Sequence, residues 1–384
     1  MIDSHMDDSH VTPSAPTITS APAGRVNGQA VNLYTLSNGR GMVVKIFNYG
    51  GVIQSIRFPD AAGTVADVTL GYPTLRDYVD HNALPGGERA TGFGTYFGAL
   101  LGRYANRIAH GRFTLRGVTH DLPLNDGPNG LHGGFVGFDQ QVWTPTVLRG
   151  GSGDEASVGL QLEYLSPNAS QGYPGNLATV ATYTLDNRNR LELSFRATTD
   201  LPTVLNLTNH TYWNLAGEAS GPVYDQTLSI NASHYTPVNA ALIPLGPHAS
   251  VVGTPFDFTT AKPIGQDIGA DDAQLRIGHG YDHNWVLNQT SPASLVEAAE
   301  ARDPASGRTL TVYTTEPGLQ FYSGNFLAGQ GVAGTGGHVY RQSDGFALEA
   351  QHFPDSPNKP SYPTTELDPG QVYSQTTVFR LSNT

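Results

Sequence analysis

The chain has 384 residues, of which 45 are Gly and 26 are Pro, while Asp, Glu, Lys and Arg together make up only 14%. This composition is unlike that of a helical bundle or coiled coil, and the 38% of hydrophobic residues exclude an intrinsically disordered chain. A net charge of −12 gives no general attraction to nucleic acid or to an anionic membrane, and the absence of Cys excludes disulfides and a cysteine nucleophile.

The first 24 residues differ in composition from the rest. Ser-His-Met at residues 4–6 is typical of a cloning remnant, and a tract rich in Pro, Ser, Thr and Ala follows up to residue 24. We expect residues 1–24 to form a disordered tail. Because such tracts often tether exported domains, a periplasmic or secreted location is favoured, and a cytoplasmic location stays open.

From Val31 onward the sequence predicts one strand after another. Short runs of β-branched or alternating apolar residues are separated by Gly, Asn and Asp clusters, which favours antiparallel hairpins. The expected strands include residues 31–36, 42–47, 52–58, 65–70, 160–164, 177–185 and 191–196. Residues 295–301 have helical propensity, but the turn at residues 303–307 and the strand-like residues 309–313 favour a hairpin there.

We expect a single domain over residues 25–384, because no long linker interrupts them. The pattern implies about 25 to 30 short strands, more than one twisted sheet tolerates, so the fold class is all-β, a large antiparallel β-sandwich. No apolar run approaches the roughly 20 residues of a membrane-spanning helix. Polar side chains in such folds gather in a concave face or a mouth, where we expect the functional site.

Several segments carry more His, Asp, Glu, Asn and aromatic residues than strand packing requires. Arg and Asn suit the recognition of neutral hydroxyl groups, and one segment places a titratable His beside an aromatic ring. The segments are residues 102–108, 129–134, 206–214, 281–285, 316–322 and 346–355, and they contain Asn106, Arg107, His132, His210, Trp213, Asp282, Gln320 and Glu349.

Each of these features also has an ordinary structural explanation. A single Glu in a strand is usually solvated or paired, a single His is usually structural, and an aromatic residue such as Trp213 often belongs to the core. His279 and His283 lie four residues apart, but the intervening Gly280 and the strand context argue against a helical metal site. No Walker motif, GxGxxG motif or Gly-x-Ser-x-Gly elbow occurs.

Taken together and in order, these motifs resemble those of the aldose 1-epimerases, also called galactose mutarotases. The matching stretches are GRYANRI from Gly102, LHGG from Leu131, NLTNHTYWNL from Asn206, YDHN from Tyr281, TEPGLQFYSGNF from Thr315 and LEAQHFPDSPN from Leu348. The resemblance runs from about residue 25 to the C-terminus. It implies a galactose mutarotase-like β-sandwich, no metal or organic cofactor, a monosaccharide substrate, and interconversion of the α and β anomers of hexoses.

The resemblance also implies residue roles. Glu349 is expected to act as the base toward O1 of the sugar, His210 as the acid at the ring oxygen, and His132 as a hydrogen-bond donor that shares the acid role. Hydroxyl groups would be held by Asn106, Arg107, Asp282 and Gln320, and the Trp213 ring would cover the apolar side of the sugar. We expect a monomer or a weak homodimer.

Three alternatives stay open. A sugar-phosphate epimerase of the same fold would need additional Arg or Lys beside the site, which the acidic balance disfavours. A non-catalytic carbohydrate-binding module would not need Glu349 and His210. A glycoside hydrolase would use two carboxylates, for which Glu349 and Asp282 are available.

Overall fold

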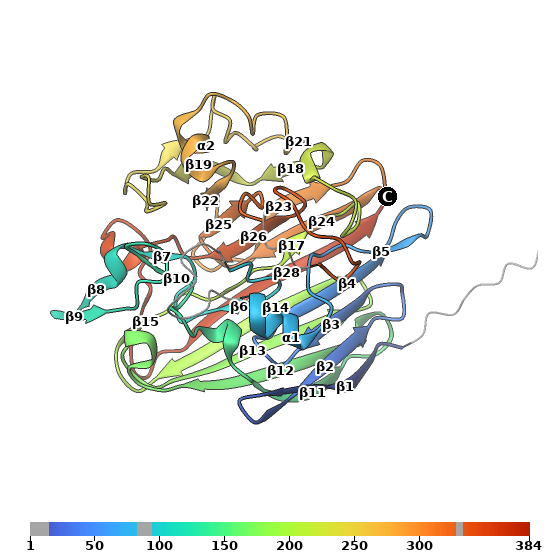
Figure 1. Ribbon diagram of the computed structural model, residues 1–384, viewed down its shortest axis with the longest axis horizontal. Helices are drawn as coiled ribbons and strands as arrows, with labels where there is room; N and C mark the ends of the chain where they lie inside the picture. The colour runs from blue at the N-terminus through green and yellow to red at the C-terminus, as the bar shows by residue number, and fades with distance from the viewer. Residues whose placement is uncertain (1–14, 83–93, 328–332) are drawn as a thin grey trace, which may run out of the picture.

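The computed structural model describes residues 15–82, 94–327 and 333–384, and within them antiparallel strands dominate (Figure 1). The largest sheet has nine strands, in the spatial order β11 (Thr144–Gly150), β12 (Ser157–Ser166), β13 (Leu177–Asp186), β14 (Arg190–Thr199), β28 (Tyr373–Asn383), β24 (Arg308–Thr314), β23 (Val296–Arg302), β18 (Thr227–Ile230) and β21 (Lys262–Pro263). The predicted all-β class is confirmed.

Two further sheets complete the framework. Five strands follow chain order in the first: β1 (Thr17–Val26), β2 (Gln29–Ser37), β3 (Val43–Phe47), β4 (Ile53–Pro59) and β5 (Val65–Asp67). Six strands form the second, in the order β17 (Tyr212–Trp213), β26 (Phe346–Gln351), β25 (Gly318–Tyr322), β22 (Asp282–Leu287), β19 (Ala232–Thr236) and β20 (Ala249–Ser250). This six-stranded sheet carries several residues of the site.

Short ladders and helices connect the sheets. The two-stranded ladders are β7 (Arg107–Ile108) with β10 (Gly130–Leu131), β15 (Thr203–Val204) with β27 (Glu366–Leu367), β16 (Thr208–Asn209) with β6 (Leu100–Leu101), and β8 (Arg112–Leu115) with β9 (Val118–Asp121). The α-helices are α1 (Leu75–His81) and α2 (Ala273–Gly278). The 3-10 turns are η1 (Ala109–Gly111), η2 (Phe138–Gln140), η3 (Gly153–Glu155), η4 (Ser170–Gly172), η5 (Val223–Asp225) and η6 (Ser356–Asn358).

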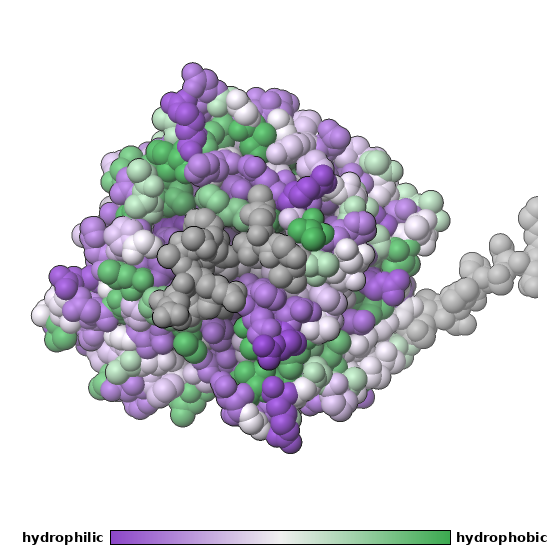
Figure 2. Space-filling model, viewed as in Figure 1, coloured by the Kyte–Doolittle hydropathy of each residue, from purple (hydrophilic) through white to green (hydrophobic). Residues whose placement is uncertain are grey.

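One continuous hydrophobic core joins the three large sheets. It includes Leu36 of β2, Leu193 of β14 and Phe321 of β25, all of them buried. Alternation in β13 and β14 directs every second side chain to this core, as a period of two requires. Polar side chains cover most of the surface seen in Figure 2, and apolar residues there form small separate patches.

The hairpin expected around residue 303 is confirmed, because β23 pairs with β24 in antiparallel register. The expected start of the domain at residue 25 is wrong, because Thr17–Val26 forms β1 along the edge of the five-stranded sheet. This strand buries little besides Ile18 and gains its order from backbone pairing with β2, and the register shifts between Pro22 and Gly24. An edge strand tolerates such a proline at a bulge.

No helix among residues 15–82, 94–327 and 333–384 is long and apolar enough to cross a membrane. Both α-helices were missed by the sequence analysis. Thr74 and Asp77 form a capping box at the start of α1, and the Asp272 side chain accepts hydrogen bonds from two backbone N–H groups at the start of α2.

Candidate active site

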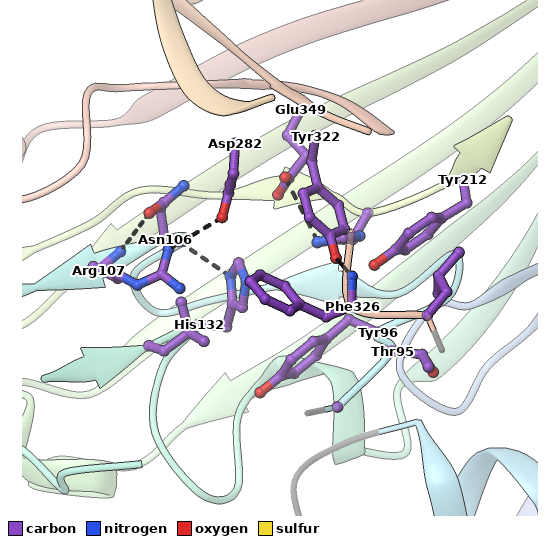
Figure 3. Close-up of a pocket in the computed structure, with 14 residues that line it drawn as sticks. Thr95, Tyr96, Asn106, Arg107, His132, Tyr212, Asp282, Tyr322, Phe326 and Glu349 are labelled. Atoms are coloured by element: carbon purple, nitrogen blue, oxygen red, sulfur yellow. Dashed lines mark hydrogen bonds and ion pairs between the residues drawn. The ribbon is translucent and has the colours of Figure 1, made fainter. Parts of the chain in front are cut away.

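A hollow of about 560 Å³, part of it open to solvent, lies where the six-stranded sheet meets the short ladders β6–β16 and β7–β10. Its lining is rich in polar and aromatic side chains (Figure 3). The lining residues are Gly94, Thr95, Tyr96, Asn106, Arg107, Leu131, His132, His210, Tyr212, Asp282, Tyr322, Phe326, Leu327 and Glu349. Six of the eight residues expected from the sequence are thus brought to one place.

Glu349 and His210 form the closest acid–base pair of the hollow. Glu349 lies in β26, whose six residues are all buried, and its side chain is only 2% exposed. His210 follows β16 directly, and its Nε2 lies 3.6 Å from Oε1 of Glu349. Oε2 of Glu349 and Nδ1 of His210 are buried without a hydrogen-bond partner among the described residues. Both groups therefore keep a free polar atom in a desolvated site.

Burial controls the protonation of this pair. Desolvation raises the pKa of Glu349 well above its ordinary value, the nearby Asp282 carboxylate raises it further, and Arg107 opposes them. Desolvation lowers the pKa of His210 to about 4. Burial therefore disfavours the charged form of both groups, the carboxylate of Glu349 and the imidazolium of His210.

His132 follows β10 and presents a fixed tautomer. Its Nδ1 accepts a hydrogen bond from the backbone N–H of Asn106 at 3.1 Å, so the proton of the neutral ring is on Nε2. Burial, followed by the neighbouring His210 and Arg107, lowers the pKa of His132 well below its ordinary value. His132 is thus a neutral hydrogen-bond donor. Its own φ of +50° and the φ of +63° at Asn106 are left-handed conformations that cluster at functional sites.

The same three side chains have the composition of a metal site, but they fit one poorly. Potential ligand atoms of His132, His210 and Glu349 all lie within 4.8 Å of one another. A ligating histidine normally donates its second N–H to a carbonyl or carboxylate group. Here Nδ1 of His132 is instead an acceptor from Asn106, which leaves the other ring nitrogen protonated and unable to ligate a metal.

Arg107 and Asp282 lie on the opposite side of the hollow from Tyr212 (Figure 3). Nη1 of Arg107 is 3.9 Å from Oδ2 of Asp282, and both side chains are largely buried. Burial raises the pKa of Asp282, while Arg107 and a hydrogen bond from Gln320 oppose that effect. Gln320 donates its amide to Oδ1 of Asp282 at 2.7 Å and lies opposite Glu349 in the β25–β26 register, but it does not line the hollow.

The expected role of Trp213 is wrong. Its side chain is 0% exposed and packs in the core against Phe379 at a ring distance of 5.3 Å. Tyr212, the preceding residue of β17, lines the hollow instead. Adjacent residues of a strand point to opposite faces, so the aromatic wall is displaced by one position in the sequence.

Four aromatic residues of the lining were missed by the sequence analysis: Tyr96, Tyr212, Tyr322 and Phe326. Tyr212 and Tyr322 belong to segments that the sequence already marked as candidates. The alternation of side chains along a strand does not place Tyr322, because it is the last residue of β25. The Tyr96 ring lies 4.7 Å from the His132 ring and 6.1 Å from the His210 ring. No motif signalled Tyr96, whose placement depends on a loop with a φ of +53°.

Comparisons with known proteins agree with this geometry. Residues 32–380 match the aldose 1-epimerase family. Galactose mutarotase of Rattus norvegicus is 42% identical over 92% of this chain and 95% of its own length, and aldose 1-epimerase of Escherichia coli is 39% identical over 94% and 99%. The crystal structure of galactose 1-epimerase from Lactobacillus acidophilus superimposes with a TM-score of 0.79 at 31% identity, covering 96% of this chain and 99% of that one. The chain belongs to the aldose 1-epimerase family, whose members are isomerases that act on carbohydrates.

Proposed function

We propose that the protein interconverts the α and β anomers of hexoses such as glucose and galactose, with Glu349 and His210 as the acid–base pair. The observation that carries this proposal is the placement of Nε2 of His210 3.6 Å from Oε1 of Glu349, with both side chains buried in the hollow. Anomer interconversion requires one group to take a proton from O1 while another gives a proton to O5. One base and one acid that exchange roles are sufficient.

The proposed cycle starts from the bound sugar with the proton of the pair on His210 and with Glu349 charged, a state that hydrogen bonds from sugar hydroxyl groups to the carboxylate would favour. Glu349 removes the proton from O1, the C1–O5 bond breaks as O1 becomes a carbonyl oxygen, and His210 gives its proton to O5. Rotation about the C1–C2 bond presents the other face of the aldehyde. Reclosure then returns the proton from O5 to His210 and the proton on Glu349 to O1, which restores the pair and inverts C1.

The other residues bind and orient the sugar. His132 donates its Nε2–H to a sugar oxygen and, through that hydrogen bond, shares the acid role of His210 at O5. Asn106, Arg107 and Asp282 hold hydroxyl groups, and Gln320 acts through Asp282, whose carboxylate it orients. Tyr96 and the other aromatic rings cover the apolar faces of the ring.

Polarimetry tests the proposal directly. Freshly dissolved α-D-galactose should reach its equilibrium rotation faster with wild-type protein, after the uncatalysed rate is subtracted. Glu349→Gln and His210→Asn should each lose most of this acceleration. If both variants anomerise the sugar as fast as the wild type, the assignment is wrong.

A further inference from the structure

Of the two ion pairs that Arg107 makes with described residues, the one with Asp126 is the shorter. Nε of Arg107 donates to Oδ2 of Asp126 at 2.7 Å, and the two side chains are only 10% and 16% exposed. A charge-assisted hydrogen bond of this length between partly buried groups fixes the guanidinium plane. Asp126 does not itself line the hollow, so it acts on the site through Arg107.

The backbone around Asp126 is held firmly. Asp126 and Asn129 exchange two backbone hydrogen bonds, of 3.1 and 3.0 Å, which close a tight turn. The neighbouring Asn125 is buried and bonds both to the backbone N–H of Leu131 and to carbonyl groups on either side of His132. The turn that carries Asp126 is therefore tied to the same β7–β10 ladder that carries Arg107.

Asp126 also contributes to the net charge around Arg107. Arg107 is the one cationic side chain that lines the hollow among the described residues, and it lies between two carboxylates, Asp126 at 2.7 Å and Asp282 at 3.9 Å. With both carboxylates ionised, these three side chains together carry a net negative charge. Without Asp126, the guanidinium would be balanced by Asp282 alone and would attract an anion more strongly.

We propose that Asp126 is a positioning and specificity-determining residue: it orients Arg107 for hydroxyl recognition and offsets its charge, so that the site selects neutral aldoses over anionic sugars. The inference rests on the proposed interconversion of anomers and adds to it a residue that controls which sugars the site accepts. Positioning requires the hydrogen bond, whereas discrimination against anions requires the charge, so two variants separate the two roles.

Asp126→Asn keeps a hydrogen-bond acceptor for Nε and removes the charge, while Asp126→Ala removes both. The matched control is Asp121→Asn, because Asp121 accepts from Nε of Arg112 at 2.6 Å on the neighbouring hairpin but is 68% exposed and away from the hollow. Polarimetry with α-D-galactose gives kcat and KM. D-galacturonate that has already reached anomeric equilibrium serves as the anionic competitor, because it contributes no change in rotation.

Asp126→Ala should raise KM for galactose about tenfold with kcat within about threefold of wild type, since Arg107 binds the sugar and takes no part in proton transfer. Asp126→Asn should retain a KM near that of wild type and show a galacturonate inhibition constant about three- to tenfold lower, the size expected for one charge near a partly buried site. Asp121→Asn should match wild type in both measurements.

Equal galacturonate inhibition in wild type and Asp126→Asn would overturn the role in selectivity, and an unchanged KM in Asp126→Ala would overturn the role in positioning. A fall in kcat with KM unchanged in either variant would also contradict the inference. If Asp126→Ala does not fold, Asp126→Asn still tests discrimination. Failure of the wild-type protein to anomerise any aldose would instead refute the proposed function.

Discussion

Glu349 and His352 lie three residues apart, and each belongs to a histidine–carboxylate pair. The two pairs differ in the distance between the partners and in the direction in which the histidine pKa is shifted. Glu349 faces His210 across 3.6 Å, whereas His352, three residues further along, contacts Glu316 at 2.5 Å between Nδ1 and Oε2. In the first pair burial dominates and lowers the pKa of His210 to about 4. In the second pair burial also acts against the charged imidazole, but the Glu316 carboxylate and its hydrogen bond outweigh it and raise the pKa of His352.

The two pairs show that β26 and the residue after it carry both a reactive carboxyl group and a stabilising contact. A direct hydrogen bond fixes the proton between His352 and Glu316, and the backbone N–H of His352 also donates to Asn206. The longer separation of Glu349 and His210 leaves the two groups without a direct hydrogen bond, and each keeps an unpaired polar atom. We infer that the close pair holds the end of β26 in place and that the open pair transfers protons.

Exchanging each carboxylate for its amide gives the largest expected contrast. Glu349→Gln should lower kcat about 10²- to 10⁴-fold, the range for a lost general acid or base, because the amide cannot carry the exchangeable proton. Glu316→Gln should leave kcat within about threefold of wild type. Polarimetry of α-D-galactose measures both, and equal losses in the two variants would remove the distinction between the pairs.

The pH dependence of kcat/KM should report the open pair alone. As pH falls through about 4, His210 becomes protonated while the Glu349 carboxyl group already carries a proton, so the pair has no base left. As pH rises through the raised pKa of Glu349, the pair loses its last proton and no acid remains. The profile should be bell-shaped, with apparent pKa values that belong to the pair. His352→Gln serves as the control and should move neither limb, while an acidic limb near the ordinary histidine pKa would contradict the argument.

Glu316→Gln should instead lower the free energy of unfolding, by about 1–3 kcal/mol, because the partly buried His352 ring loses the hydrogen bond to its charged partner. Urea denaturation measures this loss. Asp121→Asn breaks an exposed pair and should cost less than about 1 kcal/mol. A Glu316→Gln variant as stable as wild type, or one with lower kcat at unchanged stability, would show that the close pair is not structural.

Most of the fold could be predicted because apolar and polar residues alternate with a period of two in strands. The hairpin of β23 and β24 was identified against local helical propensity, since the turn at residues 303–307 left no room for a helix. The two α-helices were not identified because each is at most seven residues long and carries no sustained period of 3.6. β1 was not identified because it gains its order from pairing with β2 rather than from apolar burial.

The site was predictable to the extent that motifs carried it. Glu349 and His210 lie in distinctive stretches, but the motif alone does not say which side of a two-residue strand faces the hollow, so Trp213 was chosen in place of Tyr212. Asp126 could not be found at all, because its contact with Arg107 spans 19 residues and depends on how β7 and the turn after Asn125 meet in space.

The smallest expected effect is the pH dependence of stability that the close pair contributes. The folded protein holds the proton of His352 more tightly than the unfolded chain does, so this contribution is fully present below the unfolded histidine pKa of about 6.5 and is lost as pH rises through the raised folded value. The difference in unfolding free energy between wild type and His352→Gln should therefore shrink with rising pH above about 6.5. Urea denaturation at several pH values, with the kcat of both proteins measured alongside, tests this. A difference that grows with pH would mean that His352 is stabilising as a neutral ring and that the two pairs are more alike than their geometry indicates.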